Sequence, residues 1–169
     1  LHDDKESRGL SRVAASLTVD AGCEWGGGTG CDKSHFLGFM SYVRAWFWKH
    51  HLGATVGGGA ITNPGRYLVL VPPINGATAF TGTPYFSANP GDPYKAWDLQ
   101  VAADVMPAEF ITFRLELNHR AASVPYFTGP GGVTPPGGVN GAPATAIPGW
   151  TPDLARTEDR LTAAILVKY

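Results

Sequence analysis

The chain closes on DRLTAAILVKY, residues 159–169, in which apolar and mixed side chains alternate. The first set is Leu161, Ala163, Ile165, Val167 and Tyr169, and the second is Arg160, Thr162, Ala164, Leu166 and Lys168. Successive side chains of a β-strand point to opposite faces, so this alternation predicts a strand with one wholly apolar face. Such a face must meet either a protein core or lipid.

The same two-residue period recurs along the chain, whereas helical periodicity is scarce. We predict strands near 10–19, 35–48, 52–62, 95–106, 110–123 and 159–169, all within one segment spanning 1–169. The chain has 22 glycines, 14 prolines and only 16% charged residues, which favours many strands joined by turns and loops. The predicted fold class is therefore all-β and antiparallel.

The connections between these strands alternate in length. Those at 49–51 and 107–109 are short, and those at 20–34, 63–94 and 124–158 are long. Outer-membrane barrels have short periplasmic turns and long extracellular loops, and their strands need about 9–11 residues to cross a bilayer. A soluble β-sandwich alternates too, but it mixes its connection lengths without this regularity. We therefore predict a transmembrane β-barrel segment, and the absence of a long apolar run excludes a membrane helix.

The second face of these strands is too polar for a dry core. Arg114, Glu116, Asn118 and Arg120 share one side of a single predicted strand, and each would need a buried partner. Facing a wet lumen, they need none. The predicted pore-lining residues are Arg12, Arg44, Asp98, Gln100, Asp104, Arg114, Glu116, Asn118, Arg120, Arg160 and Lys168.

Aromatic residues and turn lengths refine this prediction. Trp97 is expected near the extracellular end, and Phe47, Phe110 and Tyr169 near the periplasmic end, where aromatic girdles lie; packing in a core is the alternative. Pore-facing residues must pair with pore-facing residues, because a one-residue slip reverses a strand. A three-residue turn at 107–109 predicts the pairs Asp104–Thr112 and Ala102–Arg114, and a two-residue turn at 50–51 predicts Trp46–Thr55, Arg44–Gly57 and Tyr42–Gly59.

Other motifs carry little chemistry. Cys23 and Cys31 flank a glycine-rich stretch, and we expect a disulfide and hence an oxidising compartment, with free thiols or a metal site as alternatives. GGGTG at 26–30 lacks the Lys-Ser/Thr of a phosphate loop. His50 and His51 have no ligand partners nearby in sequence, so no metal or other cofactor is predicted. The net charge of −1 argues against a nucleic-acid partner, and no catalytic signature predicts an enzyme.

Four stretches carry a resemblance to a known family. NPGRYLVLVPPINGATAFTGTPYFSANPGDPYKAWD (63–98) and NHRAASVPYFTGPGGVTPPGG (118–138), with FLGFMSYVRAWF and TEDRLTAAILVKY, resemble the β-barrel porin-2 family of Gram-negative bacteria. The resemblance implies the C-terminal part of an outer-membrane porin-like protein, with a signal peptide and earlier strands absent. Six strands are fewer than the minimum of about eight in single-chain barrels. It also implies that Tyr169 belongs to a terminal signal read by the barrel-assembly machinery.

The expected function is passive diffusion of small hydrophilic solutes across a bacterial outer membrane, through a lumen whose net basic wall favours anions. The expected partners are outer-membrane lipid, the assembly machinery, solutes and further copies of the chain. A barrel with a plugged lumen and adhesive loops is the alternative, and a soluble secreted β-sandwich is a third class. The apolar run Arg66–Pro73 is expected either as a hairpin above the membrane or as a segment folded into the pore.

Overall fold

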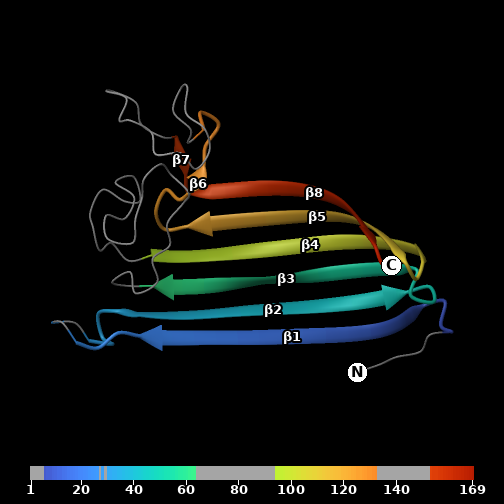
Figure 1. Cartoon of the computed structure of the whole chain (residues 1–169), viewed down its shortest axis with the longest axis horizontal. Coiled ribbons are helices and arrows are strands. Elements are labelled where there is room, and N and C mark those ends of the chain that lie inside the picture. The colour runs from blue at the N-terminus through green and yellow to red at the C-terminus, as the bar shows by residue number, and fades with distance from the viewer. Residues whose placement is uncertain (1–5, 27, 29, 64–93, 133–152) are drawn as a thin grey trace.

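A computed structural model describes residues 6–26, 28, 30–63, 94–132 and 153–169 (Figure 1). Its strands are β1 (Leu10–Cys23), β2 (His35–Phe47), β3 (Leu52–Asn63), β4 (Tyr94–Ala108), β5 (Ile111–Ala122), β6 (Phe127–Thr128), β7 (Leu154–Ala155) and β8 (Thr157–Val167). The six long strands form one antiparallel sheet in the order β1-β2-β3-β4-β5-β8, and β6 pairs with β7 in a separate ribbon. The prediction of an all-β antiparallel fold is confirmed.

The sheet is open rather than closed into a barrel. Each long strand pairs with its neighbours, and β1 and β8 form the two edges. The strands reach slightly beyond or short of the expected ranges: β1 continues to Cys23, β4 to Ala108, and β8 ends at Val167. In the described part of the chain, no helix is long and apolar enough to cross a membrane.

The connections separate the two ends of the sheet. The β2–β3 and β4–β5 turns lie at the same end as the C-terminus, and β6, β7 and the β1–β2 connection lie at the opposite end (Figure 1). We call these the turn end and the loop end. The predicted loop 124–158 contains the β6–β7 ribbon. The predicted loop segment 66–73 lies outside the described residues, so its placement stays open.

The β2–β3 register differs from the predicted one by two residues. The turn spans Trp48–His51, because Phe47 pairs with Leu52, and Trp48, Lys49 and His50 all have positive φ angles of 50°, 56° and 68°. The expected two-residue turn is therefore wrong, since three successive left-handed residues need a longer loop. The observed pairs are Trp46–Gly53, Arg44–Thr55 and Tyr42–Gly57. The two-residue shift leaves every side chain on its predicted face.

The β4–β5 register is also shifted by two residues. A bulge between Val105 and Ala108 carries β4 past Pro107. Proline cannot donate a ladder hydrogen bond, and bulges are where strands accommodate it. The predicted pairs Asp104–Thr112 and Ala102–Arg114 are wrong; Asp104 pairs with Arg114, and Ala102 with Glu116.

Candidate functional site

The burial of the two faces of the sheet is the reverse of that in a water-soluble protein, because the apolar face is exposed and the charged face is partly buried. On the apolar face, Val101 is 49% exposed, Leu117 58% and Ile165 66%. On the polar face, by contrast, Asp104 is buried. No second layer covers the apolar face in the described residues, whose long strands all belong to one sheet. Soluble monomers rarely expose so continuous an apolar surface, and such surfaces mark contact with a membrane or a partner.

Aromatic residues lie toward the two ends of the apolar face and aliphatic residues between them. Phe39 and Trp97 share a transverse row near the loop end, and Phe47 and Phe113 share one near the turn end. Phe110 is exposed in the β4–β5 turn. The rows between them carry mainly Val, Leu and Ala side chains, with Ser41 and Gly58 in the row next to Phe39. An exception is the half-exposed imidazole of His119, whose Nδ1 lies 2.7 Å from Asp159 Oδ1, toward the loop end.

The polar face carries the predicted pore-lining residues in four transverse rows. From the turn end these rows are Arg12-Trp46-Gly53-Asp104-Arg114-Ala164, Ala14-Arg44-Thr55-Ala102-Glu116-Thr162, Ser16-Tyr42-Gly57-Gln100-Asn118-Arg160 and Thr18-Met40-Gly59-Asp98-Arg120-Glu158. Lys168 and Tyr169 follow the end of β8. The structure thus brings all the predicted residues but Lys168 onto one face, while their role in a pore stays a prediction.

Asp104 is the centre of a charge cluster near the turn end. Its side chain is inaccessible to solvent, and its Oδ1 and Oδ2 accept hydrogen bonds from Arg114 Nε and Nη2 at 2.8 and 3.0 Å. Arg44 Nη1 lies 2.5 Å from Asp104 Oδ2 and also donates to Thr55 Oγ1 at 3.2 Å. The Asp104 carboxylate therefore binds two guanidinium groups. Its bidentate hydrogen bonds fix the orientation of Arg114, and its ion pair with Arg44 holds the second group beside it.

Trp46 lies between two arginines on the same face. The Arg12 guanidinium lies 5.1 Å and that of Arg44 4.8 Å from the centre of its ring, which is cation–π geometry. In the described part of the chain, no carboxylate lies within ion-pair distance of the Arg12 guanidinium. The Arg12 side chain is exposed to solvent.

Glycines in β3 make room for the large side chains of β2. A Cβ atom at Gly57 would overlap the ring of Tyr42 and the Ser41 carbonyl oxygen. Tyr42 thus lies across the bare backbone of Gly57, as large residues shield weak strand positions elsewhere. The predicted pair Tyr42–Gly59 is wrong, but the observed partner of Tyr42, Gly57, is also a glycine.

At the loop end, a chain segment following β5 folds over the polar face. Val124 is buried against Tyr94, and Ile61, Ala96 and Ala122 surround them. Arg120 pairs with Glu158 and lies 5.5 Å from the centre of the buried Phe127 ring. Burial raises the pKa of the Tyr126 phenol above its ordinary value, and the nearby Arg120 charge partly offsets the shift. This segment was predicted only as loop.

Two acidic residues of the polar face were missed by sequence reasoning. Asp20 and Glu158 lie just outside the predicted strand ranges, but β1 and β8 include them, with the even parity of the polar face. The strand-borne charges of this face are Arg12, Arg44, Arg114, Arg120 and Arg160 against Asp20, Asp98, Asp104, Glu116 and Glu158. The prediction of a net basic wall counted Lys168, which follows the end of β8, and omitted these two acidic residues. The strands themselves carry five positive and five negative charges on this face, and the charge of a pore wall stays a prediction.

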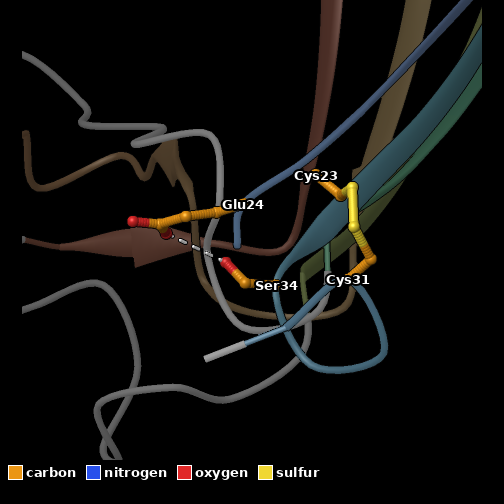
Figure 2. The surroundings of a disulfide bond; sticks show 4 residues. All are labelled: Cys23, Glu24, Cys31 and Ser34. Atoms are coloured by element: carbon orange, nitrogen blue, oxygen red, sulfur yellow. Dashed lines mark hydrogen bonds between the residues drawn. A yellow bond between two sulfur atoms is a disulfide. The ribbon is translucent and has the colours of Figure 1, made fainter. Parts of the chain in front are cut away.

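Cys23 and Cys31 form a disulfide at the loop end (Figure 2), with their Cα atoms 5.0 Å apart. Next to it, Ser34 donates a hydrogen bond to Glu24 Oε2 at 3.4 Å. In the turn at the other end, His51 Nδ1 lies 2.8 Å from the Met106 carbonyl oxygen. Within the described ranges, no three His, Cys, Asp or Glu residues gather as a metal site.

Comparisons with known proteins add no assignment. No family model, no curated protein and no solved structure matches the chain. The resemblance to the porin-2 family therefore stays a prediction from the sequence.

Proposed function

We propose that the sheet forms part of the wall of an outer-membrane β-barrel pore through which small hydrophilic solutes diffuse. The observation that carries this proposal is the reversed burial of the two faces: exposed Val101, Leu117 and Ile165 on one, buried Asp104 on the other. Lipid on the first face would cover the apolar side chains, and water on the second would solvate the arginines that surround the buried Asp104.

The dimensions of the sheet support a bilayer location. Eight residues separate the Phe39 row from the Phe47 row on β2, about 27 Å at roughly 3.4 Å per residue. With a barrel strand tilt of about 40°, this projects to about 20 Å along the membrane normal, close to the apolar band of about 25 Å between aromatic girdles. The two aromatic rows are therefore spaced as membrane-interface girdles are.

Closure of the pore requires further strands at both edges. Unpaired edges of β1 and β8 would expose backbone hydrogen-bonding groups to hydrocarbon, which is too costly for an open sheet in a membrane. We propose that additional strands or further copies of the chain complete the barrel. The exposed C-terminal Tyr169 would then belong to the signal read by the barrel-assembly machinery.

The polar face suggests a weakly selective lumen. Its strand-borne positive and negative charges are equal in number, so the electrostatic barriers for anions and cations are similar in this part of the wall. Small neutral solutes should therefore pass this part of the wall as readily as small ions do.

A barrel with an occluded lumen is the second candidate. It is favoured by Val124, Tyr126 and Phe127, which cover the polar face at the loop end. A hollow of about 390 Å³ remains between this segment and Asp98 and Arg120. Such a barrel would serve as a scaffold for its loops rather than as a channel.

Conductance in planar lipid bilayers distinguishes these candidates. The channel predicts stepwise conductance in KCl and a reversal potential near zero under a salt gradient. An occluded barrel inserts into vesicles but does not conduct. Recovery of the protein in the aqueous phase without detergent would reject both candidates and leave a soluble sandwich.

A further inference from the structure

The hollow on the turn half of the polar face has the chemistry of an anion site. It measures about 360 Å³ and is lined by Tyr42, Arg44, Trp46, Thr55, Gln100 and Arg114. Two guanidinium groups, a phenol, a hydroxyl and a side-chain amide thus converge on one space, with an indole ring beside them. Ligand sites combine ring surfaces and a few placed polar groups in this way.

The Asp104 cluster leaves hydrogen-bond donors unused. Each guanidinium has five N–H donors, and Asp104 takes two from Arg114 and one from Arg44. Thr55 takes one more from Arg44. The remaining donors are held in direction by a buried carboxylate, so a ligand does not have to order them.

The local charge favours a monovalent anion. The two rows nearest the turn end contain Arg12, Arg44 and Arg114 against Asp104 and Glu116, an excess of one positive charge. Farther along the same face, Arg120 and Arg160 stand against Asp20, Asp98 and Glu158, which reverses the sign. A solute anion would therefore be attracted to the turn half and not to the loop half.

We propose that this hollow binds a small hydroxylated carboxylate. This proposal rests on the proposed function in one respect, namely that water reaches the polar face. The carboxylate lies between Arg44 and Arg114, whose planar groups match its geometry. Thr55 and Gln100 bond the hydroxyl groups, and the Trp46 and Tyr42 rings cover the carbon chain. Arg12, next to Trp46, adds attraction without a direct ion pair in the protein.

Gluconate is the probe, with glucose as its neutral analogue. Calorimetric titration of the full chain refolded in detergent should show saturable gluconate binding and at least about tenfold weaker glucose binding. Arg12→Gln should weaken gluconate binding about fivefold, since it removes one partly solvated charge. Arg160→Gln is the matched control because it removes the same charge from the same face outside the hollow, and it should change the affinity less than about twofold.

Three results would overturn the site: no saturable gluconate binding by folded protein, equal affinity for glucose, or equal losses in the Arg12 and Arg160 variants. Bilayer conductance separates this failure from failure of the proposed function. A conducting protein that does not bind gluconate loses only the site. A protein that binds gluconate but does not conduct keeps the site and is not a channel.

Discussion

Leu117→Arg tests whether lipid covers the exposed face. Leu117 lies near the middle of β5, six residues from Ile111 and five from Ala122, and its side chain points away from the charged face. With about 3.4 Å per residue and a tilt of roughly 40°, it lies about 13–16 Å from either end of the strand along the membrane normal. That depth is close to the bilayer midplane.

The two environments predict different losses of stability. An arginine at the midplane of a barrel's lipid face costs about 2–4 kcal/mol, a thirtyfold to several-hundredfold change in the folding equilibrium. The same change at a 58% exposed position in water costs no more than about 0.5 kcal/mol. Ile165→Arg, nearer the turn end on the same face, should cost only about 0–1 kcal/mol because the penalty falls toward the interface.

The assay is equilibrium unfolding in phosphatidylcholine vesicles, followed by tryptophan fluorescence. Asn118→Arg is the matched control, because residue 118 neighbours residue 117 but faces the polar side. Wild type and this control should unfold at similar denaturant concentrations, and Leu117→Arg well below them. Equal stability of all variants, or a loss in Asn118→Arg as large as that in Leu117→Arg, would falsify the lipid assignment.

Three further predictions concern the polar face and the loop end. Asp104→Asn removes the charge that holds Arg44 and Arg114 and should lower the free energy of unfolding by about 2–4 kcal/mol; Asp98→Asn, which keeps an acceptor for the Gly59 amide, should lose under about 1 kcal/mol in the same denaturation assay. Gly57→Ala should cost about 1–3 kcal/mol because its Cβ would lie 2.5 Å from the Ser41 carbonyl oxygen. Gly53→Ala should cost less because the nearest atoms to its Cβ are side-chain atoms of Arg44, Asp104 and Met106 at 2.9–3.3 Å. Comparable unfolding midpoints for both would contradict this account. Replacing Cys23 and Cys31 with serine opens a short loop of sequence separation 8 and should lower stability by at most about 2.5 kcal/mol; thermal unfolding measures this, and a collapse of the whole sheet would show a larger role.

Side-chain periodicity predicted the faces of the sheet better than the pairing of its strands. Arg114 and Leu115 alternate in sequence and lie on opposite faces, because a strand gives each neighbour the opposite direction. Pairing depends instead on the turns. No pattern revealed the left-handed run Trp48–His50, and Pro107 was assigned to the turn although proline in a strand often marks a bulge. Both predicted registers were wrong by two residues, an even number, so no residue changed face.

The candidate site was only partly predictable for the same reason. Charged residues were assigned to the polar face one strand at a time, whereas the Asp104 cluster depends on which residues of β2, β4 and β5 meet across the sheet. The predicted register paired Asp104 with Thr112 and separated it from Arg114. Glu158 was missed because β8 begins earlier than the alternation suggested. Its even number, shared with Arg160, could have indicated that it lies on the polar face.

The preference for the observed strand alignment over the predicted one has a physical cause on the polar face. In the observed alignment, Tyr42 lies over Gly57 and Asp104 meets Arg114, so bulky rings face glycines and opposite charges face each other. The predicted alignment would have left Arg114 opposite Ala102 and Asp104 opposite Thr112. Cross-strand pairs of opposite charge stabilise a sheet, and a buried carboxylate without a cation is costly. The charged residues of the polar face therefore also favour the strand alignment that brings them together.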